Sequence, residues 1–220
     1  HQKIKNQSIG LMGAPEACQI LKNSLGFSDL AIKKLIILEK RILKANKHHN
    51  LISKSTESTI WHRHILDSAQ IVKFIDSTKY KSFADLGSGA GLPGLVVAIY
   101  GENKDFHVKL YEKSPMKRKF LLDTIKETSL KNVEVKGNIF DDEIVDKVIL
   151  SRAFKKLDKI IKISRETIKK PHKLVILKGK NAQAEINSVS LGPEYSYKIE
   201  NSITEHDSKI IIIDVKKNEK

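Results

Sequence analysis

The sequence of 220 residues contains only one cysteine, Cys18. A single thiol excludes a disulfide within the chain and any zinc site built from several thiolates. It is typical of proteins in a reducing compartment, so we expect a cytoplasmic protein. Long apolar runs are equally scarce, because the longest candidate, 209–215, has the length of a strand, whereas a membrane span needs roughly 18–20 residues. We therefore expect no membrane-spanning segment and no membrane partner.

Acidic residues are few relative to basic ones, with 26 Asp and Glu against 40 Lys and Arg and a net charge of +14. A surplus of this size favours a polyanionic partner, either nucleic acid or an anionic membrane surface. A lysine-rich composition without functional meaning would give the same count, so charge alone does not decide. Hydrophobic residues at 40% and charged residues at 30% are typical of a folded globular protein and exclude a disordered chain.

Apolar periodicity divides the chain into a helical beginning and an alternating remainder. Helices are predicted over 30–45 and 58–75; in the first, the apolar stripe leaves Lys33, Lys34 and Lys40 on the other faces. Farther along, strands alternate with helices, which predicts an α/β fold with a parallel sheet covered by helices on both faces. We expect residues 1–76 to form a helical extension packed on a core domain of residues 77–220. The strands expected are 83–86, 106–111, 133–135, 148–150, 174–177 and 210–215, and the helices 94–100, 115–128 and 157–168.

A glycine-rich loop from Asp85 to Gly94 joins the first predicted strand to the next helix. Glycine allows positive φ angles and a close approach of the backbone to a ligand, and ligands of such sheets bind beyond the carboxyl ends of the strands. Glu112 ends the second strand 21 residues after Gly91, near the spacing of about 20 expected for an acid that binds ribose hydroxyls. The pattern predicts a nucleoside-containing ligand.

Two classes of ligand fit this loop. Gly89, Gly91 and Gly94 match the dinucleotide fingerprint, so a nicotinamide enzyme is one interpretation. Pro93 argues against it, because a pyrophosphate needs backbone N–H groups in the first helical turn and proline has none. Asp85 argues against it as well, because an acid near this loop favours a cationic ligand over a phosphate. S-adenosylmethionine carries an ammonium, a sulfonium and a ribose diol but no phosphate. A glycine turn with a purely structural role is the weakest interpretation.

Six sequence blocks occur in order along the chain. They are Asn50-Leu51-Ile52-Ser53, Trp61-His62-Arg63-His64-Ile65-Leu66-Asp67-Ser68, Asp85-Leu86-Gly87-Ser88-Gly89-Ala90-Gly91-Leu92-Pro93-Gly94, Ser114-Pro115-Met116-Lys117-Arg118-Lys119-Phe120-Leu121, Ser151-Arg152-Ala153-Phe154 and Leu177-Lys178-Gly179. With these six blocks, the sequence resembles the bacterial small-subunit rRNA guanine-N7 methyltransferases, also called the glucose-inhibited division protein B family, over about residues 45–180.

The resemblance implies a class I, Rossmann-like methyltransferase sheet. The implied activity is transfer of a methyl group from S-adenosylmethionine, with S-adenosylhomocysteine as product, to N7 of a guanine in 16S rRNA, of the guanine 527 type. The implied partner is 16S rRNA or the small ribosomal subunit, and we expect a monomer. The residues implied at the methyl donor are Gly87, Gly89, Gly91, Leu92, Glu112, Ile139, Phe140 and Arg152.

The resemblance also suggests RNA contacts at Lys117, Arg118 and Lys178. Arg63 and His64 face RNA in one interpretation and cap or bridge the helix to the sheet domain in the other. One departure stands out, because Asn138 occupies a position that is often arginine in relatives, and Lys136 is the nearby candidate to replace it.

Other polar residues of the motifs have plainer interpretations. Asp67 is expected to be a structural partner of Arg63 or His64, and Trp61 to lie in the core. No metal site is expected, because His62 and His64 lie two apart on a helix and face different ways.

The chemistry of the implied reaction needs no general base, because guanine N7 has an in-plane lone pair and no proton. Catalysis then consists of holding the reacting atoms in line, and Arg152 is expected to orient the reactants by binding a carboxylate, a phosphate or a base edge. Two other functions stay open at this point. One is a methyltransferase of a substrate other than RNA, and the other is a catalytically idle RNA-binding or ribosome-assembly module.

Overall fold

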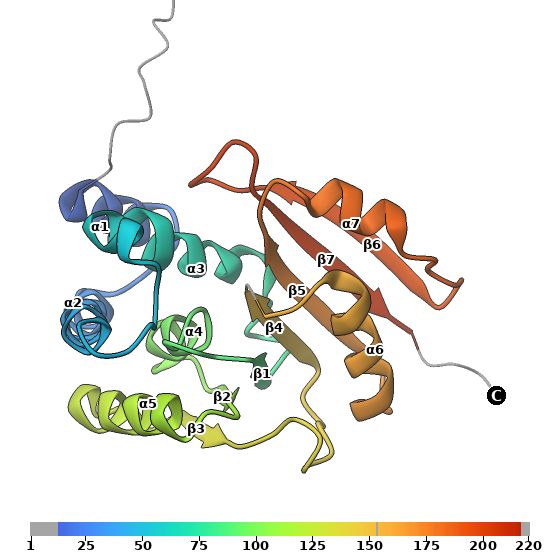
Figure 1. The fold of residues 1–220 in the computed structure, drawn as a ribbon, viewed down its shortest axis with the longest axis horizontal. Helices are drawn as coiled ribbons and strands as arrows, with labels where there is room; N and C mark the ends of the chain where they lie inside the picture. The colour runs from blue at the N-terminus through green and yellow to red at the C-terminus, as the bar shows by residue number, and fades with distance from the viewer. Residues whose placement is uncertain (1–12, 153, 217–220) are drawn as a thin grey trace, which may run out of the picture.

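The structure is a computed structural model that describes residues 13–152 and 154–216. The start of the predicted extension, residues 1–12, and Ala153 of the fifth block lie outside the described residues. Within the described residues, seven strands form one sheet in the order β3-β2-β1-β4-β5-β7-β6 (Figure 1). The strands are β1 (Ser82–Leu86), β2 (His107–Tyr111), β3 (Val133–Lys136), β4 (Val148–Arg152), β5 (His172–Lys178), β6 (Tyr195–Asn201) and β7 (Lys209–Val215).

The first five strands run parallel, and β7 is antiparallel to both β5 and β6. The strand order reverses between β1 and β4, where the connections leave toward opposite sides, and the carboxyl ends of β1, β2, β4 and β5 share one edge. In open α/β sheets this switch point is where ligands bind. The α/β prediction is confirmed, and the structure adds β6, a strand that the sequence analysis did not predict.

Helices cover both faces of the sheet (Figure 1). On one face lie α4 (Gly94–Gly101) and α5 (Pro115–Thr128), and on the other α6 (Leu157–Thr167) and α7 (Ala182–Ser188). Alternate residues of β1 serve two separate apolar cores: Phe83 belongs to the α4 and α5 side, and Ala84 to the α6 and α7 side. Burial on both faces explains why the parallel strands read as continuous apolar runs.

The N-terminal helices pack on the face that carries α4 and α5. Helix α1 (Ala14–Asn23) was not predicted, whereas α2 (Asp29–Asn46) matches the predicted helix and buries the predicted stripe of Ala31, Leu35, Leu38 and Ile42. Lys34 was expected on an outer face, which is wrong: it is buried and pairs with Glu102. The apolar residues of these helices belong to the same core as the α4 side of the sheet. The domain boundary at residue 76 stays a prediction.

The predicted helix over 58–75 is helical but irregular. It consists of η1 (Lys54–Thr59), the π-helical turn η2 (Trp61–Leu66), α3 (Asp67–Ala69) and η3 (Gln70–Phe74). Trp61 is buried, as predicted. π-Helical turns often occur at functional sites because they shift the direction in which side chains point. Within the described residues, no helix combines the length and apolar character needed to cross a membrane.

Candidate functional site

The glycine loop follows β1 and bends sharply before α4. Gly87, Gly89 and Gly91 have φ angles of +72°, +56° and +83°, which other residues adopt only at a cost. The N–H groups of Gly87 and Ser88 donate to the carbonyl of Tyr111 at 2.9 and 3.0 Å, so the loop is tied to the end of β2. The loop therefore lies at the switch point with a conformation that its glycines make possible.

Asp85 is engaged inside the protein, and its expected preference for a cationic ligand stays a prediction. Its side chain is fully buried, and Oδ2 accepts a hydrogen bond from the N–H of Gly94 at 2.9 Å at the start of α4. Burial raises the pKa of Asp85 to about 7, although hydrogen bonds from Ser88 and Gly94 lower it, as does the charge of Arg152. Asp85 therefore fixes the geometry between β1 and α4.

Glu112 connects the loop to the end of β2. Oε2 accepts from the N–H of Gly89 at 2.9 Å and Oε1 from the N–H of Ser114 at 2.8 Å, and the residue is buried. Each carboxylate oxygen has a second lone pair, so Glu112 can still accept hydrogen bonds from a ligand. The predicted acid thus reaches the glycine loop through a direct contact.

A cavity of about 450 Å³, called here the glycine-loop cavity, opens beside this contact. Its lining includes the predicted donor residues Gly87, Gly89, Glu112, Ile139 and Phe140. Tyr111, Asn138 and Phe154 also line it and were not predicted as donor contacts, and Lys117 lines it too. Gly91 and Leu92 are not in the lining: Leu92 is buried, and the side chain of Leu95 packs against the α-carbon of Gly91.

A second cavity of about 440 Å³, called here the arginine cavity, lies between the N-terminal helices and the carboxyl ends of β4 and β5. Arg63, His64, Asp67, Arg152 and Lys178 line it, together with Thr204 and Glu205 from the connection between β6 and β7. Arg152 lines this cavity and not the glycine-loop cavity, whereas Phe154, two residues later, lines the glycine-loop cavity and packs on Gly87. The two cavities therefore adjoin the same end of β4.

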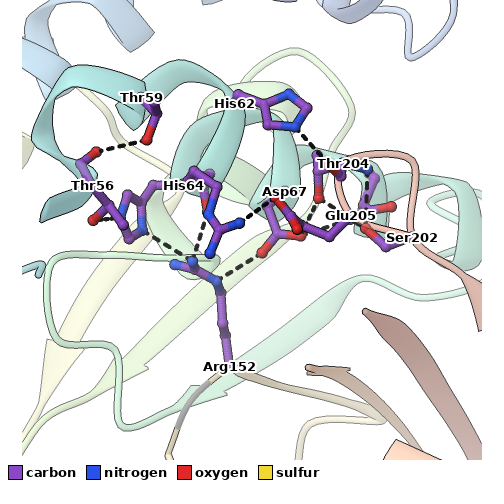
Figure 2. A network of polar contacts seen from close by, with 11 residues as sticks. Thr56, Thr59, His62, His64, Asp67, Arg152, Ser202, Thr204 and Glu205 are labelled. Carbon is purple, nitrogen blue, oxygen red and sulfur yellow. Dashed lines mark hydrogen bonds and ion pairs between the residues drawn. The ribbon is translucent and has the colours of Figure 1, made fainter. Parts of the chain in front are cut away.

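Arg152 is the centre of a polar network that joins distant segments (Figure 2). Its Nε donates to Oδ2 of Asp67 at 3.0 Å, and its Nη2 donates to the carbonyl of Arg63 at 2.9 Å and to Nδ1 of His64 at 3.0 Å. Asp67 was expected to pair with Arg63 or His64, which is wrong: its ion pair is with Arg152. Arg63 instead pairs with Glu205. No linear pattern could reveal a partner 85 positions away.

His64 is held as a neutral ring. Oγ1 of Thr56 donates to the carbonyl of Ser53 at 2.7 Å, so it accepts from Nε2 of His64 at 2.7 Å, and Nδ1 is left to accept from Arg152. Burial, reinforced by the nearby charges of Arg152 and Arg63, lowers the pKa of His64 to about 3. The ring therefore orients Arg152 and offers no charge to RNA near neutral pH.

This protonation state predicts how stability depends on pH. The unfolded chain binds a proton at His64 below pH about 6.5 and the folded protein only below about 3, so stability falls as pH falls through that window. Between pH 7 and pH 5 the wild type should lose about 2 kcal/mol more than His64→Gln. Urea unfolding of both proteins at both pH values measures this difference. Equal losses would mean that His64 is not held neutral.

Lys178 and Arg118, which were also predicted to contact RNA, lie at different places in the structure. Lys178 lines the arginine cavity, but its Nζ donates to the carbonyl of Lys155 at 2.7 Å and lies 2.9 Å from Oε2 of Glu185. Arg118 donates from Nη1 to the carbonyls of Glu112 and Lys113 at 3.0 and 2.7 Å and so braces the turn before α5. These contacts are structural, and RNA binding by the basic residues stays a prediction.

The histidines that the structure describes have other roles. Nε2 of His62 lies 2.6 Å from the carbonyl of Thr204, which links the π-helical turn to the connection between β6 and β7. Among residues 13–152 and 154–216 there is no group of three or more His, Cys, Asp and Glu side chains placed to bind a metal ion. Near Asn138, Lys136 pairs with Glu134 at 3.6 Å and does not line the glycine-loop cavity.

Comparison with known proteins gives consistent matches. A family model described as rRNA small subunit methyltransferase G matches residues 31–212. A protein named ribosomal RNA small subunit methyltransferase G from Rickettsia akari (strain Hartford) is 36% identical over 181 residues, which cover 82% of this chain and 92% of that protein. One of the same name from Pelagibacter ubique (strain HTCC1062) is 33% identical over 180 residues, covering 80% and 83%.

Solved structures match the fold at low sequence identity. The cofactor-bound protein Rv0187 from MTB aligns with a TM-score of 0.61 at 12% identity, covering 96% of this chain and 100% of that one. A mutant of MtNAS in complex with S-adenosylmethionine aligns with a TM-score of 0.54 at 10% identity, covering 94% and 85%. These likenesses concern the arrangement of the sheet and its helices.

Proposed function

The chain belongs to the rRNA small subunit methyltransferase G family, and on that premise we propose that the glycine-loop cavity holds S-adenosylmethionine and the arginine cavity receives the target guanine. The enzyme methylates N7 of a guanine in 16S rRNA. We place the target at the guanine 527 position, which rests on the family resemblance. The observation that carries the assignment of the cavities is that both adjoin the end of β4, one lined by the glycine loop and the other by Arg152.

The glycine-loop cavity has the chemistry that S-adenosylmethionine needs. A side chain added at Gly89 would point into open space, so this position leaves room beside the backbone for a ligand. Glu112 supplies a buried carboxylate for the ribose hydroxyls, and Ile139 and Phe140 supply apolar surface for the adenine. S-adenosylmethionine supplies a methyl group bonded to a sulfonium. Gly91 and Leu92 act by shaping the loop.

The arginine cavity supplies contacts for a base removed from its helix. The deep, narrow major groove of A-form RNA hides N7, so the target guanine must lie in a loop or be flipped out. The lone pair of N7 forms the new bond to the methyl carbon while the carbon–sulfur bond breaks, and the product guanine carries a positive charge. No proton moves, so Arg152 acts by orienting the base and not as an acid or base.

Several features support RNA as the partner. The net charge of +14 provides a salt-sensitive attraction to phosphates. Among the basic residues expected at RNA, Lys117 lines the glycine-loop cavity, and Arg63 and Lys178 line the arginine cavity, where they pair with Glu205 and Glu185. His64 supports such contacts by holding Arg152. We propose a monomer in the cytoplasm, because one chain lines both cavities and its substrate is ribosomal RNA.

Methylation of rRNA by the purified protein tests this function. We expect the protein and S-adenosylmethionine to place one N7-methylguanine in small-subunit rRNA taken from cells that lack this enzyme, mapped by chemical cleavage at N7-methylguanine. Naked 16S rRNA and small-subunit particles are compared as substrates. RNA binding without methyl transfer would favour an assembly module. Turnover of S-adenosylmethionine that does not depend on RNA, or methylation at another guanine, would contradict the proposal.

A further inference from the structure

Three of the five N–H groups of Arg152 have protein acceptors. The Nε–H donates to Asp67, and the two Nη2 hydrogens donate to the carbonyl of Arg63 and to His64. Among the described residues, none accepts a hydrogen bond from Nη1, and the side chain lines the arginine cavity. Because a guanidinium is planar, fixing Nε and Nη2 also fixes the direction in which Nη1 points. Two N–H groups are therefore available to a ligand in one defined orientation.

Asp67 is itself fixed, with a donor on each side. Its Oδ1 accepts from Nε2 of Gln70 and from Oγ1 of Thr204, both at 2.9 Å, and its Oδ2 accepts from Arg152 at 3.0 Å. Ser202 and Gln70 also contact each other at 2.9 Å, so the connection between β6 and β7 is joined to α3 and η3. In Figure 2, Asp67 lies between Thr204 and Arg152. The side chain is only 16% exposed, which strengthens the effect of its charge on Arg152.

A cation beside the target guanine would have opposite effects on the substrate and on the transition state. O6 of guanine carries partial negative charge and attracts a cation in the ground state. As N7 forms its bond to the methyl group, the purine becomes positive and a cation beside it becomes unfavourable. An interaction that is stronger in the ground state than in the transition state lowers kcat. A hydrogen-bond donor whose charge is cancelled would hold the base without this penalty.

We propose that Asp67 is a positioning residue that both aims Arg152 at the target guanine and cancels its positive charge, so that Nη1 donates to the base without opposing the methylation of N7. This inference rests on the proposed function, because it assumes that the arginine cavity receives the guanine. The neutral ring of His64 fits the same role, since it holds Nη2 and adds no charge. The pair of Asp67 and Arg152 then donates hydrogen bonds to the guanine in a fixed direction and carries no net charge.

Replacing Asp67 with asparagine tests the inference. Asp67→Asn keeps the size and one acceptor oxygen but leaves Arg152 as an uncompensated cation. We expect kcat with small-subunit particles as substrate to fall about 10- to 100-fold. The KM for the particles should stay the same or fall, because the uncompensated cation binds the ground-state guanine more strongly. A variant in which Arg152 is displaced from the guanine would show a raised KM instead. Affinity for S-adenosylmethionine, measured by calorimetry, should not change.

Two further variants serve as controls. Asp67→Glu keeps the charge and should retain most of the wild-type kcat. Asp214→Asn removes a carboxylate that pairs with Lys173 at 2.7 Å on β7 and β5, so it raises the net charge equally and breaks a more exposed ion pair that lines neither cavity. It should leave kcat unchanged. A thermal melt of each variant reports the folded fraction, to which the rates are normalised.

The outcomes separate the inference from the proposed function. A wild type that does not methylate N7 in rRNA overturns the proposed function. A wild type that does, beside an Asp67→Asn variant with unchanged kcat, overturns only the inference. A fall in kcat together with a raised KM, or equal losses in Asp67→Asn and Asp67→Glu, also overturns it, because geometry would then account for the loss and charge would not.

Discussion

Gly89→Val is expected to weaken the binding of S-adenosylmethionine by about 100-fold or more, that is, by about 3 kcal/mol. Gly89 lines the glycine-loop cavity, and a side chain added there would meet only open space, with the nearest atom, the carbonyl oxygen of Gly87, at 3.9 Å. The valine would therefore fill the volume that the ligand needs without clashing with the protein. Isothermal titration calorimetry with the purified variant measures the loss, and Gly89→Ala should give a smaller one.

A matched control separates blocking of the cavity from backbone strain. Valine at Gly89 adopts a φ of +56°, which costs about 1–3 kcal/mol of stability. Gly26→Val carries a similar cost, because Gly26 has a φ of +76° and open surroundings, yet it lies between α1 and α2, outside both cavities. Gly91 is a poor substitute, because a β-carbon there would lie 2.4 Å from the side chain of Leu95. Unchanged affinity in Gly89→Val, or an equal loss in Gly26→Val, would remove this loop position from the donor site.

Arg152→Ala is expected to lower the rate of methyl transfer to rRNA by about 100- to 1,000-fold, the scale for losing an oriented donor at a reacting group. The KM for rRNA should rise, because contacts to the base are lost. Affinity for S-adenosylmethionine should stay near the wild-type value, because Arg152 lines the arginine cavity and not the glycine-loop cavity. Single-turnover assays with small-subunit particles measure the transfer step, and calorimetry measures donor binding.

Arg152→Lys is the matched variant, because it keeps the positive charge and removes the planar group that contacts Asp67 and His64. We expect a loss of turnover near that of the alanine variant. Removing Arg152 also leaves the largely buried carboxylate of Asp67 without its ion pair, so thermal melts of both variants are needed to normalise the rates to folded protein. Wild-type turnover in either variant would show that the guanidinium does not orient the guanine.

Local patterns in the sequence were sufficient for most of the fold. The apolar runs of β1, β2 and β4 and the proline at the start of α5 predicted elements that the structure contains at nearly the same positions. The stripe on α2 predicted which residues are buried, because helical periodicity and packing are linked through the geometry of a single helix. The position of Glu112 beside the glycine loop also followed from spacing, because adjacent parallel strands end at one edge of the sheet, whereas its hydrogen bond with Gly89 was not predicted.

Patterns failed where an element depends on a distant neighbour. Strand β6 is exposed over Ser196, Tyr197 and Lys198, so it lacks the apolar run that identifies a strand, and it forms by pairing with β7. Lys34 reads as a surface lysine, and only the approach of α4 brings Glu102 to it. Asp85 precedes the glycine loop, and no local pattern indicated that the start of α4 would bury its carboxylate.

The sequence by itself determined the parallel α/β sheet, the glycine loop at its edge and the acid that meets that loop, because each depends on residues close in the chain or on strands that pair in a regular way. The tertiary structure alone decided the arginine cavity. Arg152 and Thr204 lie 85 and 137 positions from Asp67 in the chain, and no periodicity relates the three residues. They meet because α3, β4 and the connection between β6 and β7 are brought together by burial of the two apolar cores, and only that packing fixes the hydrogen bonds that orient Arg152.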